Sequence, residues 1–138
     1  MITVFLGIHG VCCYDGKTID KNIINRIVKI ANCTNLAIIS YDRIFDRSRK
    51  HIVKQIKSCL KDVSIDFLRE SNAGFGSDSI ADIIEEYVKE YEPDKWCVID
   101  SYDNDFRQLK RFENKFVLFN SENFTKTIEK KIKYAINN

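Results

Sequence analysis

Short apolar segments alternate along the chain with longer segments in which apolar residues recur at helical spacing. The short, strand-like segments are 2–8, 35–40, 63–68, 95–100 and 115–119. The helical segments are 20–32, 47–61, 77–91 and 125–136, and a further helical turn is expected within 104–112. Strands that are apolar throughout are typical of a mainly parallel sheet with helices on both faces. The pattern therefore predicts an α/β fold, a three-layer Rossmann-like sandwich of about five strands.

The length and composition are ordinary for a globular domain. The chain has 138 residues, of which 44% are hydrophobic and 30% charged, and a formal net charge of +2. A chain of this size can bury roughly two-thirds of the surface that its unfolded form exposes. It contains no apolar run of membrane-spanning length and no basic leader, so we expect neither a membrane segment nor a signal peptide. We expect residues 1–138 to form a single domain.

The cysteines bear on the cellular compartment. Their number is odd, and they lie in apolar or helical segments, at positions 12, 13, 33, 59 and 97. This usage favours reduced thiols in a cytoplasmic protein over a disulfide framework. The chain is also rich in isoleucine, lysine and asparagine. Such a bias is typical of AT-rich coding, as in some viruses and low-GC bacteria, and for a viral protein the compartment would be the host cytoplasm.

Small and polar residues gather where three of the predicted strands end. Gly7, His9 and Gly10 follow the first strand, and Ser40 ends the second. The fourth strand ends in a group of polar residues, namely Asp100, Ser101, Asp103 and Asp105. Ligands of parallel sheets bind outside the carboxyl ends of the strands. These residues therefore mark the candidate site.

The order of these segments resembles the haloacid dehalogenase-like (HAD) phosphatase superfamily, most closely its small, cap-less domains associated with RNA repair. "FLGIHGV" stands where the family has a strand followed by Asp-x-Asp-Gly-Val, and "AIISYDR" resembles its second motif. "GSDSIADIIEEYV" stands at the third motif, and "WCVIDSYDND" resembles the fourth, an apolar strand ending in paired acids. The tail "KFVLFNSENFTKTIEKKI" resembles the closing strand, loop and helix. The resemblance implies an HAD-like sandwich without a cap domain.

The resemblance also implies a degenerate catalytic site. In the family, the first Asp attacks phosphorus, the second serves as general acid and base, and a Lys or Arg of the third motif steadies the phospho-intermediate. Here Gly7 stands at the nucleophile position and His9 at the acid/base position, and glycine has no group that can attack. Ser101 stands at the second acid of the fourth motif, and residues 70–88 contain no Lys or Arg. We therefore expect a pseudophosphatase without catalytic residues, its remnant site formed by Gly7, His9, Ser40, Asp100 and Ser101.

A metal site is expected to be lost or weak, and no cofactor is expected. Mg²⁺ requires several oxygen ligands, and Asp100 alone holds it poorly unless Asp103 or Asp105 folds back toward it. An alternative is a divergent metal-dependent phosphohydrolase in which His9, Asp100 and Asp103 bind metal and activate water. In the simplest alternative, His9 only hydrogen-bonds a neighbouring loop and Asp100 only caps a loop amide.

Two charge runs of opposite sign point to binding. Segment 43–61 has seven basic residues and one acid, whereas 78–105 has ten acids and two basic residues. Such runs are usually solvated helix faces, yet opposite runs also attract a protein partner or a second copy. That kind of partner is the leading expectation, with nucleic acid as an alternative and no membrane partner. The candidate contacts to nucleic-acid phosphates are Arg43, Arg47, Arg49 and Lys50, with Tyr41 beside them.

Overall fold

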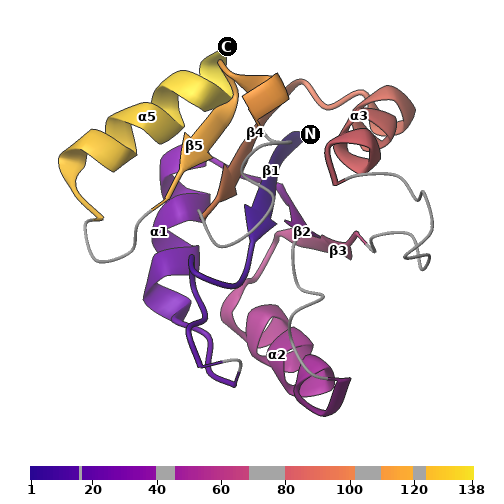
Figure 1. Ribbon diagram of the computed structural model, residues 1–138, viewed down its shortest axis with the longest axis vertical. Coiled ribbons are helices and arrows are strands. Elements are labelled where there is room, and N and C mark those ends of the chain that lie inside the picture. Colours follow the sequence, from indigo (N-terminus) through magenta and orange to yellow (C-terminus); the bar gives the residue numbers. More distant parts are fainter. Residues whose placement is uncertain (16, 40–45, 69–79, 102–109, 120–123) are drawn as a thin grey trace.

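The computed structural model describes residues 1–15, 17–39, 46–68, 80–101, 110–119 and 124–138. Five strands form one parallel sheet in the order β3-β2-β1-β4-β5 (Figure 1). The strands are β1 (Ile2–Gly7), β2 (Asn35–Ile39), β3 (Ser64–Phe67), β4 (Lys95–Asp100) and β5 (Phe116–Leu118). All five lie within the predicted strand segments. The predicted α/β fold with a parallel sheet is therefore confirmed.

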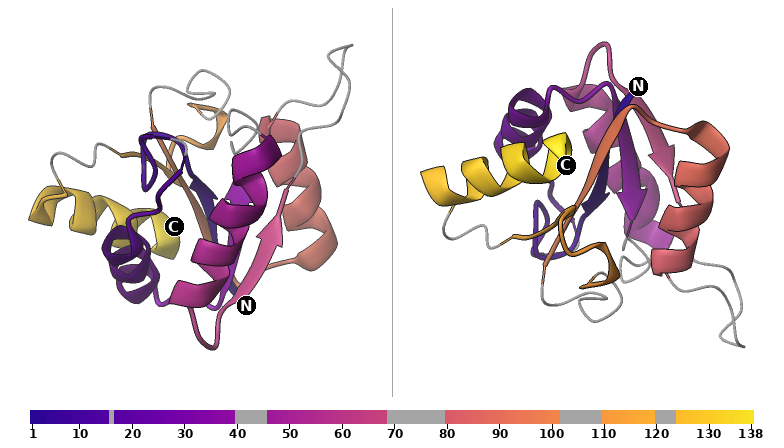
Figure 2. Two further views of the ribbon diagram at one scale, coloured as in Figure 1. Left: turned by 90° about the horizontal axis from the view of Figure 1, so that it is seen from below. Right: turned by 90° about the horizontal axis from the view of Figure 1, so that it is seen from above.

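Helices cover both faces of this sheet. They are α1 (Lys21–Ala31), α2 (Asp46–Cys59), α3 (Ile80–Tyr91) and α5 (Lys126–Asn137), with a short 3-10 helix η1 (Lys110–Phe112). Figure 2 shows α1 and α5 on one side of the sheet and α3 on the other. Residues of α2 pack into the same core as those of α1 and α5. This arrangement confirms the three-layer Rossmann-like sandwich. η1 lies within the segment 104–112 where a helical turn is expected, and residues 104–109 of that segment lie outside the described residues.

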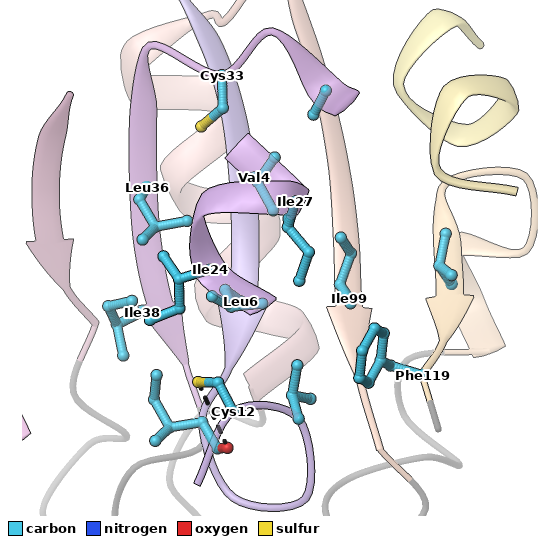
Figure 3. Packing of buried hydrophobic residues seen from close by; sticks show 14 of the residues in the cluster. Val4, Leu6, Cys12, Ile24, Ile27, Cys33, Leu36, Ile38, Ile99 and Phe119 are labelled. Atoms are coloured by element: carbon cyan, nitrogen blue, oxygen red, sulfur yellow. Dashed lines mark hydrogen bonds between the residues drawn. The ribbon is translucent and has the colours of Figure 1, made fainter. Parts of the chain in front are cut away.

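The central strand β1 divides the core in two. Successive side chains of a strand point to opposite faces, so alternate residues of β1 enter different layers. Val4 and Leu6 pack in the layer that contains Ile24 and Ile27 of α1 (Figure 3). Phe5 enters the opposite layer, where it packs with residues of α3. Both faces of β1 are therefore covered, which explains why its sequence is apolar throughout.

Capping residues set both ends of α1. At the start, the side chain of Asp20 accepts hydrogen bonds from the backbone N–H groups of Asn22 and Ile23. At the end, Asn32 adopts a left-handed conformation with φ 54°, and its N–H donates to the carbonyl oxygen of Lys29. A polar N-cap and an Asn at the left-handed C-terminal position are common helix terminators. Within the described ranges, no helix is both long enough and apolar enough to cross a membrane.

A chain of polar side chains links β1, β2 and β3 to α3. Asn35 donates from Nδ2 to Thr3 Oγ1 at 3.1 Å and to the hydroxyl of Tyr87 at 2.8 Å. The Tyr87 hydroxyl in turn donates to Asp66 Oδ2 at 2.5 Å. Burial raises the pKa of Tyr87 well above its ordinary value, and the hydrogen bond to Asp66 raises it further. Tyr87 therefore remains a hydrogen-bond donor throughout the physiological pH range.

We expect Tyr87→Phe to lower the free energy of unfolding by about 1–2 kcal/mol, because buried Asn35 loses an acceptor that the phenyl ring does not replace. Urea denaturation measures the change. Tyr91→Phe is the matched control, since Tyr91 lies on the same helix with its side chain exposed, and its effect should stay within about 0.5 kcal/mol. Equal losses in the two variants would show that the polar chain does not stabilise the fold.

Candidate functional site

The site expected from the sequence lies where β1 and β4 end side by side. These strands are neighbours in the sheet, and their register pairs Leu6 with Ile99. The next residues along the two strands, Gly7 and Asp100, therefore meet at the same edge. The structure thus brings together the two residues that the resemblance assigns to the nucleophile position and to the fourth motif.

Asp100 fills the space that a side chain at position 7 would need. A Cβ atom added to Gly7 would lie 1.9 Å from Asp100 Oδ1 and 2.3 Å from Asp100 Cγ. Gly7 pairs with Ile39 in the regular ladder of β1 and β2. Any residue can adopt such extended backbone, so glycine is required at position 7 for its lack of volume. With Asp100 in its observed conformation, there is no room for a side chain at position 7.

Asp100 is fully buried, and short local contacts fix its position. Its Oδ1 accepts a hydrogen bond from the backbone N–H of Ser101 at 2.8 Å. Its backbone oxygen accepts another from the N–H of Phe119 at 2.8 Å, just after β5. The carboxylate therefore accepts a hydrogen bond from a loop amide.

Ser101 links the ends of β4 and β1. Its hydroxyl donates to the backbone oxygen of His9 at 3.0 Å. The sequence placed Ser101 where the family has a second acid, and in the structure this side chain holds two loops together. Its buried position supports a structural role.

His9 belongs to a tight turn that follows β1. The carbonyl oxygen of Ile8 accepts hydrogen bonds from three successive backbone N–H groups, those of Val11, Cys12 and Cys13. Gly10 has a φ of 80°, a left-handed conformation that glycine adopts without strain. The turn fixes the backbone of His9, whose side chain is half-buried at the edge of the site.

Cys12 and Cys13 belong to the core. The thiol of Cys12 lies 3.8 Å from the carbonyl oxygen of Ile8, inside the cluster of buried apolar side chains (Figure 3). Burial is the main cause that raises the pKa of this thiol, and nearby negative charge, including that of Asp100, raises it further. Among the described residues, no three His, Cys, Asp or Glu side chains are grouped so that they could hold a metal ion. The described residues thus offer no metal site built on His9 and these thiols.

Several candidates lie outside the described residues. They are Ser40, Tyr41, Arg43, Asp103 and Asp105. Arg47 and Arg49 belong to the first turn of α2, and Lys50, one residue later, is exposed. Because α2 follows β2, this turn begins near the carboxyl edge of the sheet.

Lys115 does not take the place of the Lys or Arg that the HAD family has in its third motif. Its Nζ lies 4.7 Å from the centre of the Trp96 ring and donates to the backbone oxygen of Trp96 at 3.2 Å. Trp96 is the second residue of β4, so this cation lies toward the opposite end of the strand from Asp100. Burial lowers the pKa of Lys115. Its surroundings are those of a structural cation–π contact.

Two features escaped the sequence analysis. The first is the exclusion between Gly7 and Asp100, whose signal was a glycine and an acid at the ends of strands that become neighbours. The second is the positive charge of α1 and α5. The basic segment 43–61 stands out in the sequence, whereas the lysines of "KTIEKKIKY" near the C-terminus are less conspicuous. No family model, curated protein or solved structure matches the chain. The function is therefore inferred from the chain's own residues.

We expect Cys59 to be the thiol that a disulfide reagent modifies first in the folded protein at pH 8. All five cysteines are thiols, and Cys59 is partly exposed whereas the others are buried. Burial raises the pKa of Cys97 to about 12 and also raises that of Cys33. Since the thiolate is the reactive form, these groups should react only after unfolding. Colour release from 5,5′-dithiobis(2-nitrobenzoate) measures the phases.

Cys59→Ser is the control for this labelling experiment, and it should remove the fast phase. Burial also raises the pKa of Cys59. In the parent protein, the rate at which Cys59 is labelled should therefore increase as the pH rises from 8 to 9, because the thiolate fraction is still growing. A fast phase that persists in Cys59→Ser would show that a second thiol is accessible in the folded protein.

Proposed function

We propose that this protein is an HAD-like domain that has lost phosphatase chemistry and works by binding. The observation that carries the proposal is the packing of Asp100 against Gly7, which leaves no volume for a nucleophile at position 7. Such a domain keeps the sheet of the family, while the Asp100 carboxylate occupies the space where the family has its nucleophile. We place it in a reducing compartment, in keeping with its five thiols.

The remaining groups do not replace the missing nucleophile. Removing a nucleophile has cost on the order of 10⁶ in rate where it was measured. Asp100 could attack phosphorus only if its carboxylate reached a substrate, and it is fully buried with one oxygen bonded to the Ser101 amide. His9 could move a proton, but it would have no covalent step to serve.

The donor set also fits Mg²⁺ poorly. This ion prefers an octahedral shell of oxygen ligands and keeps several waters. Asp100 points into the space above Gly7, and the described residues contain no group of three potential ligands. We therefore derive no step through a metal ion. The divergent hydrolase built on His9, Asp100 and Asp103 remains the competing proposal, with Asp103 outside the described residues.

The sequence gives priority to a protein partner or a second copy, because the two charge runs are opposite. Part of the acidic run is already neutralised within the chain. Arg111 contacts Asp82 at 2.7 Å and Glu85 at 3.4 Å. Lys89 adds a cation to the same helix. The acidic helix therefore offers less charge to a second copy than its sequence indicates.

We expect no hydrolysis of p-nitrophenyl phosphate above the buffer rate, with Mg²⁺, Mn²⁺ or Zn²⁺ supplied in turn. Release of p-nitrophenolate measures turnover. Asp100→Asn is the matched variant, because it keeps the shape of the side chain and removes its charge.

Turnover that Asp100→Asn abolishes would overturn the proposal and favour the hydrolase built on His9 and Asp100. Turnover that survives in Asp100→Asn would point to a contaminating phosphatase, which a repeat purification from a different host would remove. Equal rates for protein and buffer would support a domain that binds without converting a substrate.

A further inference from the structure

Three helices place their exposed cations on one face of the sheet. α1 carries three basic residues and no acid, and α5 carries four lysines and one acid. We call this surface the basic face and define it by its described, exposed members, which are Lys21, Arg26, Lys29, Lys50, Lys54, Lys57, Lys126, Lys130, Lys131 and Lys133. The helices pack side by side, α1 between α2 and α5. Exposed positive charge thus covers the whole helical layer formed by α2, α1 and α5.

A groove of about 400 Å³ lies between α1 and α5. Its polar lining comes from Arg26 and Lys29 of α1 and from Glu129 and Lys133 of α5. Arg26 bonds Glu129 at 2.8 Å and stacks on the ring of Phe124, 3.8 Å from its centre, so this pair is fixed and internally neutral. Within the described residues, neither Lys29 nor Lys133 forms an ion pair. These two ammonium groups remain for an anion from outside.

The other side of α5 borders a second groove, of about 840 Å³, beside the edge strand β5. Lys130 and Lys131 line it together with Tyr134, whose side chain is 60% exposed. An exposed aromatic ring beside lysines suits a nucleic-acid base, which stacks while its phosphates meet the cations. α5 is thus a basic ridge with a groove on each side.

We propose that α5 and its two grooves bind the phosphate backbone of a single-stranded nucleic acid. Lysine is depleted in protein–protein interfaces, whereas nucleic-acid interfaces are strongly positive. Two described acids line the grooves beside α5: Glu129, which is paired with Arg26, and Glu113, at the groove beside β5. Two of the four acids of α3, Asp82 and Glu85, are already paired with Arg111, which leaves a second copy fewer acids to bind. The basic face lies on the flank of the sheet, and its role holds whether or not the domain hydrolyses phosphate.

Fluorescence anisotropy with a labelled 20-nucleotide single-stranded RNA, and with the same sequence as DNA, tests the proposal. Four phosphate contacts, through Lys29, Lys130, Lys131 and Lys133, predict a slope of log K against log salt of about −2.8. The affinity should therefore fall about 50-fold between 50 and 200 mM salt. No binding at 50 mM salt, or binding that salt does not weaken, would overturn the proposal.

Charge reversal locates the surface. The double variant Lys29→Glu/Lys133→Glu should weaken binding about tenfold or more and reduce the slope by about 1.4. The control is Lys61→Glu/Lys89→Glu, which changes the net charge equally at exposed positions outside the three helices. Equal losses in the two variants would mean that net charge alone drives binding, and would overturn the assignment to this face.

Two further measurements separate the alternatives. Tyr134→Ala should weaken single-strand binding about tenfold and leave binding of the duplex form unchanged, and an unchanged single-strand affinity would overturn the preference for single strands. Sedimentation velocity without nucleic acid tests the other occupant. Self-association that Lys29→Glu/Lys133→Glu abolishes, combined with no nucleic-acid binding, would assign the basic face to a second copy. The aryl phosphate assay is independent of both results.

Discussion

The structure depends on the register between β1 and β4, which places Gly7 beside Asp100 at the carboxyl edge of the sheet. A buried carboxylate needs hydrogen-bond donors and room, because its desolvation is otherwise costly. The Ser101 amide supplies a donor, and the missing side chain of Gly7 supplies the room. Ser101 then ties this edge to the turn after β1 through the oxygen of His9. Gly7 thus leaves the space that the buried Asp100 carboxylate occupies between the ends of β1 and β4.

The packing of Asp100 against Gly7 argues against the phosphatase chemistry that the sequence motifs suggest. In a parallel sheet the carboxyl edge is the usual ligand site, since loops and polar groups converge there. Here Asp100, the acid that ends β4, is buried against Gly7. The exposed, chemically distinctive surface is instead the helical layer, where α1, α2 and α5 place their lysines. We therefore propose that binding occurs on the flank of the sheet and that Asp100 has a structural role at its edge.

The sequence predicted the fold well, because apolar strands such as 95–100 and periodic helices such as α1 are local signals. The site was harder to predict. Asp100 was a candidate metal ligand, and its burial against Gly7 follows from a strand pairing that joins residues 93 positions apart in the sequence. The basic face was hidden for the same reason, since Lys29 and Lys133 line one groove only after the strand order brings α1 and α5 together. Charge counts along the chain do not contain that information.

The most direct test of this account is a double-mutant cycle between positions 7 and 100, measured by urea unfolding. Gly7→Ala should cost about 2 kcal/mol in the parent protein, because the new Cβ displaces the Asp100 carboxylate from its amide partner. In an Asp100→Ala background, where the displaced atoms are absent, the same change should cost less than about 0.5 kcal/mol. Equal costs in the two backgrounds would contradict the account, since they would show that Asp100 does not occupy the space of a side chain at position 7.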